Sequence, residues 1–143
     1  MFIGEYHHAL DDKGRLAMPV RFRIDFKGGA VVTRGLDNCL FVYTKKAWEE
    51  LAGKLSKLPI AKANTRAFAR LMLAGAMEIE IDSQGRVLVP DYLREFAKIK
   101  RQVVVAGVYD RLEIWDEKVC DGYRKNSEKS STDIAEALGE LGV

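Results

Sequence analysis

Two arginine-containing segments of nearly the same sequence are the residues best suited to chemistry in this chain. Residues 11–23 contain an Asp-x-x-Gly-Arg motif followed by a proline and further arginines, and residues 82–94 repeat this pattern 71 positions later. The planar fork of an arginine side chain suits phosphate oxygens and the edges of guanine bases. A duplicated basic turn therefore predicts binding to a repeating polyanion.

Within each motif, the acidic and glycine residues are predicted to form the turn and the cations to face a ligand. Glycine accepts the positive φ that a tight turn needs. The predicted turn-forming residues are Asp11, Gly14, Asp82 and Gly85. The predicted ligand-binding cations are Lys13, Arg15, Arg21, Arg23, Arg86 and Arg94. A purely structural alternative is that each aspartate caps its turn while the arginine pairs with it.

The distribution of charge favours an anionic partner. Residues 1–109 carry 18 Lys and Arg against 12 Asp and Glu, a net charge of +6, whereas residues 110–143 carry 5 against 9, a net charge of −4. The body of the chain is therefore basic and its tail acidic, which weakly favours a negatively charged partner for the body.

The elements that must position the turns are also predicted to repeat. In each copy, short strands flank the turn, a proline opens a helix, and a hairpin follows. We expect a first repeat at residues 5–47, a helical connector at 48–75 and a second repeat at 76–119. Thr44 is the predicted N-cap of the first connector helix. Residues 120–143 are predicted to be a polar tail that is mobile over 124–132 and has a short helix near its end.

Other classes of protein fit this sequence poorly. His7 and His8 are adjacent, so on a strand they face opposite sides and cannot share a metal ion. Phosphate-loop, zinc-spacing and nucleophile-elbow motifs are absent, and the two cysteines occupy unmatched positions in the two copies. We therefore predict a protein that is not an enzyme and has no cofactor and no metal. The lack of a long apolar run or a secretory signal predicts a cytoplasmic protein without a membrane partner.

Several segments of the chain together resemble the MraZ family of bacterial transcriptional regulators. The resemblance covers nearly the whole chain and is weakest after about Tyr123. It is carried by Met1–Tyr6, by both Asp-x-x-Gly-Arg turns with Pro19 and Phe22-Arg23, and by Gly35–Asp37, Trp48 and Leu112–Trp115.

The resemblance implies a mixed β/α fold of two tandem AbrB-like swapped-hairpin repeats, which form a pseudo-dimer barrel within one chain. It implies a ring-shaped homo-oligomer in the cytoplasm, associated with the nucleoid. It also implies binding to short direct repeats in double-stranded DNA upstream of its own gene, and repression of the division and cell-wall gene cluster. The family's DNA contact carries over to Arg15 and Arg86. Position 84 is Gln where position 13 is Lys, so the second turn has one charge fewer than the first.

Two further classes of function stay open from the sequence. AbrB-like folds also serve as antitoxins, which would make this chain a partner-binding protein, although residues 124–143 are short for a toxin-wrapping tail. Alternatively, the arginines could form salt bridges between subunits of a structural ring that has no specific contact with DNA.

Overall fold

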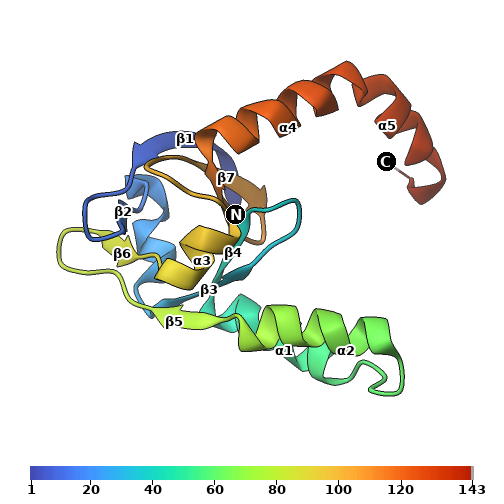
Figure 1. Ribbon diagram of the computed structural model, residues 1–143, viewed down its shortest axis with the longest axis horizontal. Helices are drawn as coiled ribbons and strands as arrows, with labels where there is room; N and C mark the ends of the chain where they lie inside the picture. The colour runs from blue at the N-terminus through green and yellow to red at the C-terminus, as the bar shows by residue number, and fades with distance from the viewer. Residues whose placement is uncertain (143) are drawn as a thin grey trace.

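The two halves of the chain contain the same order of elements. The computed structural model describes residues 1–142, and its first half contains β1 (Phe2–Ala9), β2 (Arg15–Ala17), the 3₁₀ helix η1 (Val20–Phe26), β3 (Ala30–Arg34), β4 (Leu40–Thr44), α1 (Lys45–Ser56), α2 (Ala63–Ala69) and the π-helical turn η2 (Arg70–Ala74). The second half contains β5 (Met77–Ile79), β6 (Arg86–Leu88), α3 (Asp91–Phe96), β7 (Gln102–Tyr109), β8 (Leu112–Asp116), α4 (Glu117–Lys129), α5 (Ser131–Ala137) and η3 (Gly139–Leu141) (Figure 1).

The strands of the two halves are interlocked. β1 pairs with β7, and its counterpart β5 pairs with β3, the counterpart of β7. Like strands also meet across the halves, because β4 pairs with β8 and β2 pairs with β6. Each half thus completes its sheet with strands of the other, which makes the two copies one folding unit.

The expectation of a closed barrel is wrong for the part of the chain that the structure describes. The larger sheet is open, with six strands in the order β1-β7-β8-β4-β3-β5, and β2 and β6 form a separate two-stranded ribbon. Closure would require the edge strands β1 and β5 to pair. β5 has only three residues and is already paired on one side with β3, so it has few backbone groups left to pair with a further strand.

The six-stranded sheet is covered on both faces, and the alternation of side chains along β4 separates the two cores. Leu40 and Val42 point into a core shared with the β2–β6 ribbon, η1 and α3. Phe41 and Tyr43 point the other way, into a core shared with the long helices. This period of two is the geometry expected for a strand. The first core fixes the ribbon and its turns against the sheet.

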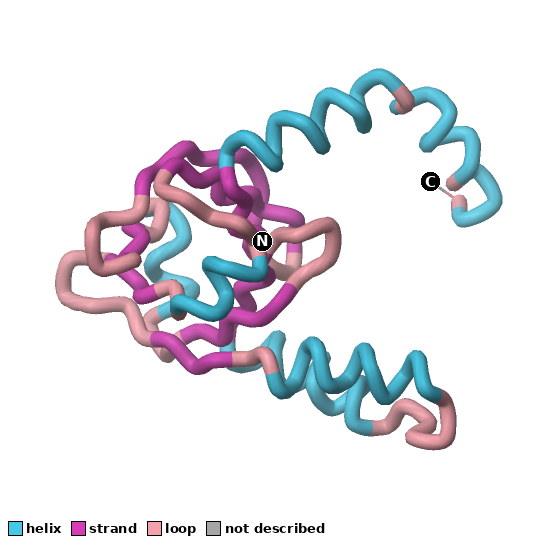
Figure 2. Tube along the Cα trace, in the orientation of Figure 1, coloured by secondary structure: helices cyan, strands magenta, loops and turns pink. Residues whose placement is uncertain are grey.

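The helices after each hairpin form two arms that leave the sheet (Figure 2). α1 begins at Lys45, so the predicted boundary at residue 47 falls inside this helix. Thr44 caps α1 as predicted, because its hydroxyl accepts a hydrogen bond of 3.2 Å from the Ala47 amide. Among residues 1–142, no helix has the length and apolar character needed to span a membrane.

The polar stretch over residues 124–132, for which the sequence predicts mobility and not a helix, is helical over most of its length, because α4 continues to Lys129 and α5 starts at Ser131. The composition is polar, but local interactions stabilise the helix. The Asp116 carboxylate caps its first turn, and Arg124 forms ion pairs with Asp121 and Glu128 one turn to either side.

Candidate nucleic-acid interface

The first basic turn is organised by one carboxylate. Oδ1 of Asp11 accepts hydrogen bonds from the amides of Lys13, at 2.9 Å, and of Arg15, at 2.8 Å. Oδ2 lies 2.6 Å from Nε of Arg15. Gly14 has a φ of +80°, and its amide donates a 3.0 Å hydrogen bond to the Asp11 carbonyl. These bonds hold the pKa of Asp11 down at about 2, with the Arg15 amide as the largest cause.

The second turn has the same geometry. Oδ1 of Asp82 accepts from the amides of Gln84 and Arg86, each at 2.9 Å, and Oδ2 accepts from Nε of Arg86, also at 2.9 Å. The hydrogen bond from the Arg86 amide is again the main reason that the pKa of the carboxyl lies below its usual range. In both turns the aspartate fixes the backbone and one edge of the guanidinium, as the structural alternative described.

The β2–β6 ribbon brings the two turn arginines onto one face. Arg15 pairs with Leu88, and Ala17 pairs with Arg86, whereas Leu16 pairs with Val87 and faces the core. Arg15 and Arg86 therefore both point outward, with 31% and 27% of their side chains exposed. We call the outward side of this ribbon, formed by Arg15, Ala17, Arg86 and Leu88, the ribbon face. Nη1 of Arg86 lies 3.8 Å from Oδ2 of Asp11, so one carboxylate touches both arginines.

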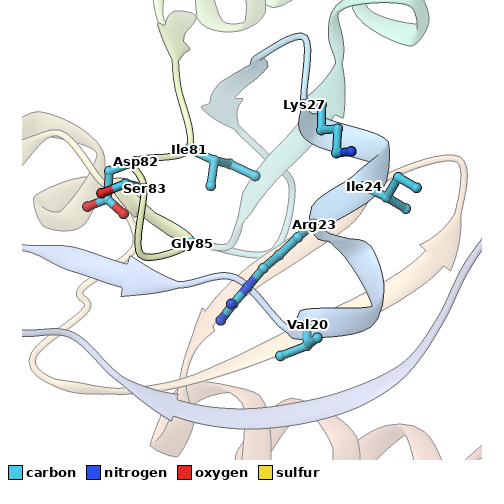
Figure 3. A pocket seen from close by; sticks show the side chains of 8 residues that line it. All are labelled: Val20, Arg23, Ile24, Lys27, Ile81, Asp82, Ser83 and Gly85. Atoms are coloured by element: carbon cyan, nitrogen blue, oxygen red, sulfur yellow. The ribbon is translucent and has the colours of Figure 1, made fainter.

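Arg23 and Arg94 have a different setting, because each lies over the turn of the other half. A Cβ atom added to Gly85 would lie 2.4 Å from Cζ of Arg23, and one added to Gly14 would lie 2.7 Å from Cζ of Arg94. Figure 3 shows Arg23 extending from η1 toward Gly85. Nε of Arg23 also donates to the Met18 carbonyl at 2.8 Å. Both guanidinium groups thus pack against the turns and position them.

The other predicted cations lie around the ribbon face. Lys13 is exposed within the first turn. Arg21 is exposed on η1, where it donates to the Tyr6 hydroxyl at 3.2 Å and lies over the ring of Phe22. Sequence order associates Arg101 with the second half, yet it lies beside the first turn, because its carbonyl accepts from the Leu10 amide.

The arrangement can bind anions, and its charges are partly neutralised. Five cations lie on or beside the ribbon face, namely Lys13, Arg15, Arg21, Arg86 and Arg101. Three carboxylates accompany them, those of Asp11, Asp12 and Asp82. Guanidinium groups held at one edge still present their remaining N–H donors, which suits phosphate oxygens and base edges.

Fold and site together define a tandem-repeat β/α protein whose two halves share one cationic two-stranded ribbon. Residues 1–71 and 72–140 each match the family described as "MraZ protein, putative antitoxin-like", so each match includes one helical arm. The chain belongs to this MraZ family.

Relatives of the same length share close to half of their residues with this chain. Proteins named "Transcriptional regulator MraZ" are 48% identical in Thermoanaerobacter pseudethanolicus, 46% in Moorella thermoacetica and 45% in Halothermothrix orenii. Each of these three comparisons covers 143 residues, which is 100% of this chain and 100% of the relative.

Proposed function

We propose that this protein is a transcriptional regulator that binds double-stranded DNA in a sequence-specific manner. The observation that carries the proposal is the pairing of β2 with β6, which puts Arg15 and Arg86 on one outward face. The relatives named as transcriptional regulators support the same function. The major groove of B-form DNA admits a two-stranded β-ribbon, and an arginine fork can donate to two acceptors of a guanine.

In this proposal the cations divide into three roles. Arg15 and Arg86 contact base edges or the adjoining phosphates. Lys13 and Arg21 are exposed at the margin of the ribbon face and position the protein on the DNA backbone. Arg23 and Arg94 hold the glycine turns in place beneath them.

One ribbon offers few contacts, so high affinity requires several copies of the protein on neighbouring sites. We propose a ring-shaped homo-oligomer that engages short direct repeats upstream of its own gene and represses the division and cell-wall gene cluster. Linkage between subunits raises the effective concentration of each ribbon at the next repeat. Such a protein acts in the cytoplasm at the nucleoid.

Fluorescence anisotropy tests DNA binding with the fragment upstream of the protein's own gene and a shuffled fragment of equal length. Arg15→Ala and Arg86→Ala are each expected to weaken binding to the native fragment by ~1–3 kcal/mol, on the order of 5- to 150-fold. Arg70→Ala is the matched control, because Arg70 is an exposed arginine in η2, on the helical arm of the first half and outside the ribbon face.

Three results would argue against the proposal. If Arg15→Ala and Arg70→Ala weaken binding equally, the ribbon face is not the contact surface. If the native and shuffled fragments bind equally at two salt concentrations, the interaction is nonspecific. If neither fragment binds, a structural ring or an antitoxin-like partner becomes the better hypothesis.

A further inference from the structure

The C-terminal segment presents an apolar face that is exposed in the described part of the chain, residues 1–142. Ile134, Leu138 and Leu141 are spaced by four and three residues, so they lie on one side of α5 and η3. They are 46%, 38% and 73% exposed. An amphipathic helix gains most of its stability by packing this face against another surface, so a partner surface is expected.

The corresponding helix of the first half has such a surface within the chain. α1 carries Leu51 and the buried Leu55, and Leu58 follows just after its end; Leu51, Leu58 and Phe68 of α2 pack against the same core as Leu55. The equivalent positions 72 residues later are Tyr123 and Ser127 in α4 and Ser130 just after its end. α4 therefore lacks the aliphatic stripe that would hold α5 against it, and α5 extends from its far end (Figure 1).

A groove that could accept this face lies beside η1. It is a cavity of about 490 Å³ lined by Val20, Ile24 and Ile81, with Val20 and Ile24 76% and 67% exposed. Figure 3 shows these apolar side chains with Arg23 and Lys27 among them. The corresponding surface of α3 is acidic, because Asp91 and Glu95 occupy the positions equivalent to Val20 and Ile24.

The charges of the two surfaces are complementary. α5 and η3 carry Asp133, Glu136 and Glu140, and the chain has no Lys or Arg after Lys129. The groove carries Arg23 of η1 and Lys27, which follows this helix directly, and one carboxylate, Asp82, at its rim. Opposite charges around an apolar contact favour this pairing and disfavour the pairing of α5 with another acidic α5.

We propose that α5 and η3 of one copy dock into the η1 groove of a second copy. In this arrangement α5 cannot fill the groove of its own chain, because α5 lies across the molecule from β2 and β6 (Figure 1). Each copy donates a helix and receives one, which makes the contact head-to-tail and able to close a ring. This inference rests on the self-association in the proposed function and names the contact that produces it.

Native mass spectrometry and light scattering on three substitutions test this contact. Ile24→Glu blocks the groove, Leu138→Glu blocks the helix, and Ile60→Glu is the control at another apolar residue, 81% exposed. All three sites are exposed, and circular dichroism checks that each variant is folded. Ile24→Glu and Leu138→Glu are each expected to reduce the wild-type assembly to the 16.1 kDa monomer, whereas Ile60→Glu keeps the wild-type mass.

Mixing the two disrupted variants is the decisive step. The Ile24→Glu chain keeps its helix and the Leu138→Glu chain keeps its groove, so a 1:1 mixture should form a dimer and nothing larger. If the mixture stays monomeric, or if either variant alone keeps the wild-type mass, the contact is not the proposed one. If the wild type is itself a monomer, the proposed self-association fails together with this inference.

Discussion

The two halves of this chain are alike at their turns and unlike at their helical arms. Asp11 and Asp82 each bind two backbone amides and one arginine Nε in the same way. In contrast, the first arm has a buried aliphatic core between its helices, whereas the second extends with polar residues at the equivalent positions. The two halves are therefore alike at the turns that flank the shared β2–β6 ribbon. They differ in their helical arms, which within residues 1–142 do not pair with each other.

The largest expected effect lies in the arms. Leu55 is 6% exposed, so Leu55→Ala should lower the free energy of unfolding by about 2–5 kcal/mol through lost burial and a cavity. Ser127, its counterpart on α4, contributes little packing, and Ser127→Ala should change stability by no more than about 0.5 kcal/mol. Urea unfolding measures both changes in the free energy of unfolding. Similar losses for the two substitutions would mean that the arms do not differ in packing.

The turns should respond equally to a smaller perturbation. Gly14 and Gly85 have φ values of +80° and +79°, and an added Cβ would meet a guanidinium group from the other half. Gly14→Ala and Gly85→Ala should each lower the free energy of unfolding by about 2 kcal/mol, from backbone strain and displacement of the arginine.

Gly53→Ala on α1 is the control for these two glycine substitutions. Its added methyl group would have open space, and alanine should stabilise the helix by roughly 0.5–1 kcal/mol. A clear difference between Gly14→Ala and Gly85→Ala in thermal unfolding would mean that the two turns are not equivalent.

The local elements could be predicted from the sequence, because their signals lie within a few residues. Alternating apolar residues predicted the strands, and a threonine before an apolar stripe predicted the start of α1. The pairing of strands could not be predicted, since β2 and β6 are joined by contacts between residues about 70 positions apart. The helix over 124–129 was also missed, because its polar composition concealed a capping aspartate and ion pairs.

The candidate site was predictable only in part for the same reason. The duplicated motif identified Arg15 and Arg86, but the ribbon that puts them side by side depends on long-range pairing. The crossed positions of Arg23 and Arg94 over glycines of the other half were not foreseen. The available signal was that Arg23 and Arg94 occupy the same position in the two copies of the motif. That signal indicates a contact with the opposite turn only once the halves are known to interlock.

The smallest expected effect concerns the one charge that distinguishes the turns. Lys13 and Gln84 occupy equivalent positions, and the amide of each binds the aspartate of its own turn. If both turns face DNA, Gln84→Lys should steepen the dependence of log affinity on log salt by about one unit, and Lys13→Gln should reduce it by about one unit. Neither change should alter the preference between native and shuffled fragments, because a phosphate contact carries no sequence information. Anisotropy across a salt series measures both slopes. A response to Lys13→Gln alone would mean that only the first turn approaches DNA, although both turns have the same geometry.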